Sequence, residues 1–106
     1  MMHSMDNLKK LSRFGKLAPE AANAFWAYDK VALADGAIPK KYKELMAIAV
    51  ALTTQCVYCI ELHRQGALQA GATEEELVEA VHVATALRAG GAITHGTHLL
   101  PTDDAA

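Results

Sequence analysis

The chain has 106 residues, of which 52% are hydrophobic and 21% charged, and its formal net charge is -2. This length fits one folded domain, and this balance of apolar and charged residues excludes a disordered chain. The sequence contains twenty-one alanines, which favour closely packed helices but contribute little buried area each. We therefore expect a thin core within one chain and a homo-oligomer that covers the remaining apolar surface.

Charge and hydropathy exclude two classes of partner. The basic residues form no cluster larger than the pairs Lys9-Lys10 and Lys40-Lys41, so we expect no nucleic-acid partner. The longest apolar run, residues 45–52, falls well short of the roughly 18 residues that span a bilayer, so we expect no membrane segment. Residues 1–10 carry charges of both signs without an apolar stretch behind them. They do not resemble a secretory signal, and we expect a cytoplasmic protein.

The chain shows helical periodicity and no strand pattern, which predicts an all-α fold. The expected helices of the N-terminal half cover residues 6–14, 19–34 and 39–54. Gly15 closes the first helix, and Pro19 suits the first turn of the second, which Asp35 and Gly36 end. The third helix has an apolar surface too broad for a solvent-facing helix, so we place it centrally. It ends at a polar break over residues 53–55.

Three further helices are expected in the C-terminal half, over residues 56–70, 74–89 and 92–100. Gly71 follows the first of them in the position of a glycine C-cap. Thr73 and Glu76 have the spacing of a capping box, in which each side chain satisfies a free backbone donor at a helix start. The pair Gly90-Gly91 predicts a kink or break before the last helix. On the helix over 74–89 we expect a buried stripe formed by Leu77, Val81, Ala84 and Leu87.

Chemistry is concentrated in residues 56–63. Cys56 and Cys59 are three residues apart and Cys59 and His63 are four apart, so the three side chains lie along one helix face. A thiol attacks as the thiolate, and the helix N-terminus and a histidine one turn away both lower the pKa of a thiol. His63 reaches Cys59. Cys56 is placed to attack an oxidised Cys59, as a disulfide-cycling pair requires.

Glu44 belongs to the same site if the third and fourth helices fold back on each other. With a rise of about 1.5 Å per residue, Glu44 and His63 then lie at comparable heights. A carboxylate facing an imidazole fixes its tautomer and completes a relay of the nucleophile, base and orienter type. The alternative is that Glu44 pairs with Lys40 or Lys41 at the surface, and the spacing does not decide between the two.

The two cysteines have two other interpretations. Small thiols also pack between alanine-rich helices, but that leaves the spacing of His63 and Glu44 unexplained. A metal site would use Cys56, Cys59 and His63 with a fourth ligand from His95 or His98. Three ligands on one helix are not the usual zinc arrangement, and there is no second cysteine pair, so no metal is expected. Of the other histidines of the C-terminal half, His82 is expected in the core or at an interface, and His95 and His98 at an interface or on the surface.

The spacing of Glu44, Cys56, Cys59 and His63 resembles that of the AhpD-like alkylhydroperoxidase branch of the carboxymuconolactone decarboxylase family. The resemblance covers residues 25–98. It implies an all-helical bundle of five to six helices, assembled as trimers or hexamers. It also implies a single domain over residues 1–106, with 1–17 as an N-terminal extension or short helix and 101–106 as a flexible tail.

The resemblance assigns a role to each residue of the motif. Cys59 is expected to attack the peroxide, Cys56 to resolve the oxidised cysteine and face the partner, His63 to act as base and Glu44 to support it. In one place the chain departs from the family pattern. Well-characterised AhpD proteins have a histidine directly before the second cysteine, where this chain has Tyr58. Tyr58 is the candidate for this place in the relay because it can donate a hydrogen bond, although a phenol is a poor proton shuttle at neutral pH.

The expected activity is therefore that of a thiol-dependent antioxidant enzyme that reduces hydroperoxides or disulfides. No cofactor is expected, and an external dithiol or a lipoyl-type reductant protein would return the cysteines to the reduced state. The alternative is a redox sensor, disulfide reductase or ligand-binding module of the same fold without peroxidase turnover. The decarboxylase branch lacks the cysteine pair as a working unit, so its lactone chemistry is the weaker expectation.

Overall fold

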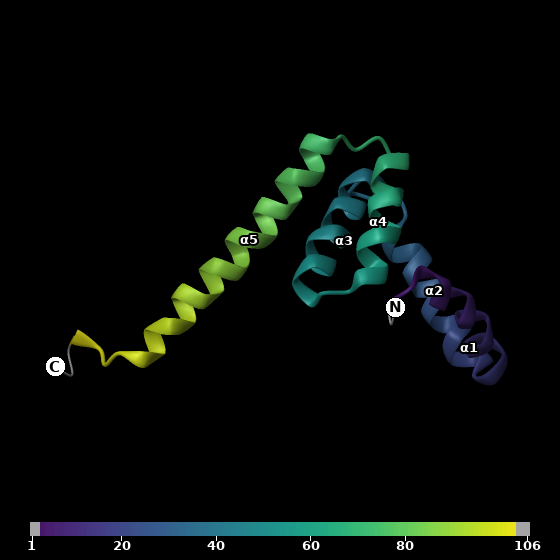
Figure 1. Ribbon diagram of the computed structural model, residues 1–106, viewed down its shortest axis with the longest axis horizontal. Coiled ribbons are helices and arrows are strands. Elements are labelled where there is room, and N and C mark those ends of the chain that lie inside the picture. Colours follow the sequence, from purple (N-terminus) through teal and green to yellow (C-terminus); the bar gives the residue numbers. More distant parts are fainter. Residues whose placement is uncertain (1–2, 104–106) are drawn as a thin grey trace.

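The computed structural model describes residues 3–103, and within them every regular element is a helix (Figure 1). The all-α prediction is therefore confirmed. Two 3₁₀ helices, Met5–Lys10 and Thr97–Leu99, flank five α-helices. The α-helices are α1 (Leu11–Leu17), α2 (Pro19–Leu33), α3 (Lys40–Thr54), α4 (Val57–Gln69) and α5 (Glu74–Gly96). In this part of the chain no helix is both long enough and apolar enough to cross a bilayer.

The central position predicted for α3 is confirmed. α3 packs against α4, which lies beside it, and also contacts α5 and α2. α5 runs outward on one side of the α3–α4 pair, while α1 and α2 lie on the other side (Figure 1). The site residues on α3 and α4 are thus carried by the best-packed helix pair of the chain.

The core is thin, as the alanine content predicts. Its buried hydrophobic residues are Ile48, Ala51, Ala67, Ala72 and Ala84. No large side chain in the described part of the chain is fully buried. The stripe predicted on α5 is only partly confirmed, because Ala84 is buried whereas Leu87 is 69% exposed. A single chain therefore leaves much of α5 uncovered.

The predicted end of the first helix is wrong. A 3₁₀ helix, Met5–Lys10, continues directly into α1, and α1 passes through Gly15 to Leu17. The helix ends because Ala18 precedes Pro19, and a proline disfavours the helical conformation of the residue before it. Ala18 accordingly has φ -141° and ψ 71°.

The predicted break at Gly90 and Gly91 is also wrong, because α5 continues through both residues to Gly96. A glycine inside a helix costs about 1 kcal/mol relative to alanine, which a long helix tolerates. The hydroxyl of Thr94 donates to the carbonyl of Gly90 at 2.8 Å, within the same helix. The separate helix expected over residues 92–100 is therefore the end of α5 followed by a short 3₁₀ turn. Of the tail expected over 101–106, residues 104–106 lie outside the described part.

The predicted capping box at the start of α5 is confirmed. Glu76 N–H donates to Thr73 Oγ1 at 3.1 Å, and Thr73 N–H donates to Glu76 Oε1 at 2.9 Å. The other oxygen of Glu76 pairs with Lys41 Nζ at 2.9 Å and ties α5 to α3. Lys41, followed by the backbone of Thr73, holds the pKa of the Glu76 carboxyl below its ordinary value. The same ion pair raises the pKa of Lys41.

Two substitutions test this cap. Thr73→Ala is expected to lower the free energy of unfolding by about 1 kcal/mol, because one helix-start donor loses its partner. Glu76→Gln is expected to weaken the pH dependence of stability. A carboxyl whose folded pKa is depressed stabilises the fold above its unfolded pKa, ordinarily 4.5, and this contribution is lost as the pH falls through the folded value. Urea titrations at pH 7 and pH 3.5 measure both effects, with Glu75→Gln as the matched control. Equal pH dependence in Glu76→Gln and wild type would contradict this assignment.

Candidate active site

A tight reversal between α3 and α4 positions the cysteines. The helix expected over residues 39–54 ends at Thr54 as predicted, and the hydroxyls of Thr53 and Thr54 donate to the Val50 carbonyl at 2.8 and 3.1 Å within it. The chain turns at Gln55, whose left-handed backbone has φ 59°. The N–H of Cys56 then donates to the Ala51 carbonyl at 3.0 Å. The predicted polar break is therefore a one-residue turn that places Cys56 at the start of α4.

Cys56 and Cys59 both lie in the first turn of α4 and form a disulfide. Cys56 is the N-cap residue, and its Sγ accepts a hydrogen bond from the N–H of Cys59 at 3.2 Å. Both residues are partly buried, and their Cα atoms are 5.3 Å apart. The N-terminus of a helix carries a partial positive charge, which favours a thiolate there once the disulfide is reduced.

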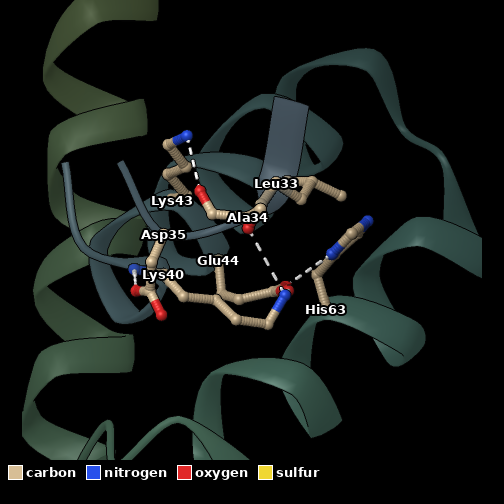
Figure 2. A network of polar contacts seen from close by, with 7 residues as sticks. All are labelled: Leu33, Ala34, Asp35, Lys40, Lys43, Glu44 and His63. Carbon is tan, nitrogen blue, oxygen red and sulfur yellow. Dashed lines mark hydrogen bonds and ion pairs between the residues drawn. The ribbon is translucent and has the colours of Figure 1, made fainter. Parts of the chain in front are cut away.

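Glu44 and His63 meet across the α3–α4 interface, as the antiparallel arrangement predicts (Figure 2). Glu44 Oε2 lies 2.6 Å from His63 Nδ1. The Glu44 residue is only 4% exposed, and the side chain of His63 is 22% exposed. With the carboxylate as acceptor, Nδ1 carries the proton and Nε2 is left to accept one. His63 follows Cys59 by four residues on α4, so its ring lies one turn below the disulfide.

The alternative partner of Glu44, Lys40, is present as well. Lys40 Nζ lies 3.3 Å from Glu44 Oε1, and it also donates to the carbonyl of Leu33 at 3.4 Å (Figure 2). The backbone N–H of Lys40 donates to Asp35 Oδ1 at 2.7 Å. Lys41 instead pairs with Glu76, so that part of the expectation is wrong. Glu44 thus has one oxygen on the histidine and the other on a lysine, which satisfies a charge that burial would otherwise penalise.

The acidic residue of α4, Glu61, has partners on its own helix. Its carboxylate accepts from Arg64 at 2.8 Å and from Gln65 at 3.0 Å. Arg64, followed by Gln65, holds the pKa of the Glu61 carboxyl below its ordinary value. The charge of Glu61 is therefore paired within α4, and the carboxylate that binds His63 is that of Glu44.

Tyr58, between the two cysteines, contacts the N-terminal segment. Its hydroxyl accepts a hydrogen bond from Asn7 Nδ2 at 2.9 Å, and the His3 ring lies edge-on at 6.1 Å between centroids. No sequence pattern announces this contact, because the two partners are 51 positions apart. The expected relay role of Tyr58 stays a prediction.

The remaining histidines lie elsewhere. His82, His95 and His98 are exposed, so a core position for His82 is wrong. His95 Nδ1 lies 3.1 Å from the carbonyl of Gly91, within α5. Over residues 3–103, no group of three or more His, Cys, Asp or Glu side chains is arranged to hold a metal ion.

Gly66, which the sequence analysis did not single out, borders the Glu44 carboxylate. A Cβ atom at this position would lie 2.8 Å from Glu44 Oε2. A small residue three positions after His63 does not by itself indicate a role in the site. The role becomes visible only when α3 is packed against α4, because the contact is with Glu44 on α3.

The fold and the site together define an all-helical protein in which a disulfide at a helix start is followed one turn later by a partly buried histidine that a buried glutamate holds. Residues 19–100 match the carboxymuconolactone decarboxylase family, and the chain belongs to that family. The resemblance drawn from the cysteine motif is therefore confirmed at the level of the family, with which the AhpD-like pattern is consistent.

Relatives and solved structures agree with this assignment. The chain is 49% identical over 82 residues to an uncharacterised protein of the cox locus of Paracoccus denitrificans, covering 77% of this chain and 74% of that protein. It is 31% identical over 97 residues to an uncharacterised protein of Cupriavidus necator, and this match covers 92% of the present chain and 86% of that protein. A carboxymuconolactone decarboxylase family protein from Legionella pneumophila, solved in its apo form, superposes with a TM-score of 0.73 at 39% identity. This match covers 77% of the present chain and 73% of the Legionella chain. A protein from Methanobacterium thermoautotrophicum superposes with a TM-score of 0.77 at 32% identity. This match covers 83% of the present chain and 99% of the Methanobacterium chain.

Proposed function

We propose that the protein is a thiol-dependent antioxidant oxidoreductase that reduces hydroperoxides through a Cys56–Cys59 disulfide cycle. One observation carries the proposal. The cysteine pair occupies the first turn of α4, and a histidine one turn below is held by a buried carboxylate 2.6 Å away. A nucleophile near a base that is itself oriented by a third group is the arrangement of covalent catalysis. Two thiols that only filled space would not require a buried charge beneath them.

The proposed cycle begins with the reduced protein. The Cys59 thiolate attacks the distal peroxide oxygen, the O–O bond breaks, and Cys59 becomes a sulfenic acid while the alkoxide leaves and is protonated to the alcohol. The Cys56 thiolate then attacks the sulfenic sulfur, a disulfide forms, and hydroxide leaves as water after protonation. An external dithiol reduces the disulfide by thiol exchange and is itself oxidised to a disulfide. The net reaction converts a hydroperoxide and a dithiol into an alcohol, water and a disulfide.

His63 and Glu44 support the first step. His63 Nε2 takes the proton of the Cys59 thiol and then returns it to the leaving alkoxide. Glu44 holds the proton on Nδ1, which keeps Nε2 in the accepting form and stabilises the imidazolium while it exists. Lys40 Nζ lies 3.3 Å from the other carboxylate oxygen and helps to hold the group in place.

The cycle needs a co-substrate and no bound cofactor. We propose a small dithiol or a lipoyl-type reductant protein, which meets Cys56 at the helix start. The cytoplasm is the proposed compartment, because thiol-reducing systems there return cysteine pairs to the dithiol form.

A turnover assay tests the proposal. The reduced protein is given hydrogen peroxide or an organic hydroperoxide with a dithiol in excess, and consumption of the peroxide is followed, together with formation of the alcohol where the substrate is organic. Saturable turnover at a rate above that of the dithiol alone is expected. If the protein instead reduces disulfides without consuming peroxide, it is a disulfide reductase. If oxidation only changes its size in solution, it is a redox sensor. Either result contradicts the peroxidase assignment.

We also propose that the chain works as a homo-oligomer, a trimer or a hexamer. Its radius of gyration is 18.5 Å, whereas a compact domain of this length has about 13 Å. Large apolar side chains are uncovered along the outer helices, among them Trp26, Tyr28, Val31, Leu87 and Ile93. Exposed apolar surface of this extent marks an interface. Analytical ultracentrifugation is expected to give a mass of three or six chains, and a dilute, fully active monomer would contradict this proposal.

A further inference from the structure

The Glu44 carboxyl group lies directly against the backbone of α4 at Gly66. A Cβ atom built on Gly66 would be 2.8 Å from Oε2, 2.9 Å from Cδ and 3.0 Å from Oε1 of Glu44. Carbon atoms in a protein do not approach one another or an oxygen this closely without one of them moving. The carboxylate therefore occupies space that any other residue at position 66 would fill.

The carboxylate has little freedom to yield. Glu44 is 4% exposed, Oε2 is bound to His63 Nδ1 at 2.6 Å, and Oε1 is bound to Lys40 Nζ at 3.3 Å. Ala67, the next residue of α4, is 0% exposed, so the helix backbone is packed against its neighbours and resists withdrawal. A side chain at position 66 would therefore displace the Glu44 carboxylate and weaken its contacts with His63 and Lys40.

Gly66 differs from the other glycines inside the helices. Gly15, Gly90, Gly91 and Gly96 would each place a Cβ in open space in this chain. A glycine within a helix is less stable than an alanine, because its backbone loses more freedom on folding. At position 66 the lower helix stability of glycine is found where the buried Glu44 carboxylate fills the volume that a Cβ atom would take. We take this as an indication that the site requires a glycine there.

We propose that Gly66 is a positioning residue of the site, whose missing side chain lets the Glu44 carboxylate reach His63 Nδ1. The residue acts through Glu44 and touches no reacting atom. The inference rests on the proposed function, because only there does His63 act as the base for Cys59. It adds a fifth position to the motif of two cysteines, a histidine and a glutamate.

The test is a double-mutant cycle with a matched glycine. Gly66→Ala and Gly90→Ala are made in the wild-type chain and in Glu44→Ala, and the melting temperature and the pH profile of thiol alkylation are measured on the reduced proteins. In the wild-type chain, Gly66→Ala is expected to lower the melting temperature and to slow alkylation near pH 7 by about tenfold, the loss expected when a thiol returns to its ordinary acidity. Gly90→Ala is expected to leave the pH profile unchanged.

In the Glu44→Ala background the crowding is gone. Gly66→Ala is then expected to raise the melting temperature, as alanine does inside a helix, and to leave the alkylation profile where Glu44→Ala put it. If Gly66→Ala alone does not fold, recovery of folding in the double variant supports the proposal. Failure of both variants to fold overturns it.

The results separate the two proposals. If Glu44→Ala shifts the alkylation profile but Gly66→Ala does not, the positioning role is overturned and the relay stands. If Glu44→Ala itself leaves the profile unchanged, the relay fails and the positioning role fails with it, whatever the melting temperatures show.

Discussion

Replacing Cys59 by serine is expected to abolish hydroperoxide turnover. A serine hydroxyl is not ionised at neutral pH and cannot be oxidised to a sulfenic acid, so the first bond is never made. The variant is expected to fold, because serine is close to cysteine in size and the position is only partly buried. The measurement is alcohol formation from an organic hydroperoxide in the presence of excess dithiol.

Cys56→Ser is the matched control for this prediction. It removes the resolving thiol and leaves Cys59, so without external dithiol it is expected to consume one equivalent of peroxide and to stop at a sulfenic acid that a dimedone-type reagent traps. Because Cys56 is the N-cap residue of α4, a serine there keeps a good capping group. If Cys59→Ser still consumed one equivalent and Cys56→Ser consumed none, the roles of the two cysteines would be reversed.

Replacing His63 by alanine is expected to slow the reaction of Cys59 at pH 7 by about two orders of magnitude, the lower end of general-base contributions. Without the imidazole, the pKa of the Cys59 thiol rises toward its ordinary value near 8.5. The loss is therefore expected to shrink as the pH is raised to about 9.5, where the thiol ionises unaided. Stopped-flow measurement of peroxide reduction across this pH range checks the prediction.

His82→Ala provides the control, since His82 is exposed on α5 and outside the site. It is expected to behave as the wild type at every pH. A His63→Ala variant whose rate at pH 7 matched that of His82→Ala would show that the thiol needs no base from this residue. The buried carboxylate of Glu44 would then have only a structural role.

Local signals in the sequence predicted much of the helical order. Pro19, Pro39 and the Thr73–Glu76 capping box set helix starts by local sterics and hydrogen bonds, and the structure confirms all three. The break predicted at Gly90 and Gly91 was wrong because each glycine costs a helix only about 1 kcal/mol, and the other residues of the 23-residue α5 keep it helical through both.

The part of the candidate site that lies within the single helix α4 could be predicted from the sequence. The spacing of Cys56, Cys59 and His63 follows from the helical repeat, whereas the partner of Glu44 depends on how α3 packs against α4. The choice between His63 and Lys40 had no answer in the spacing, because each takes one oxygen of the same carboxylate. Gly66 could not be predicted for the same reason, because its importance depends on its contact with the Glu44 carboxylate across the α3–α4 interface.

The central claim is that Cys56 and Cys59 form a cycling pair driven by peroxide. Mass spectrometry of the intact reduced protein, taken seconds after one equivalent of hydroperoxide and again after dithiol, tests it most directly. We predict a rapid loss of two hydrogens that dithiol fully restores. A mass that stays at the reduced value, or a gain of oxygen that dithiol does not reverse, would contradict the claim.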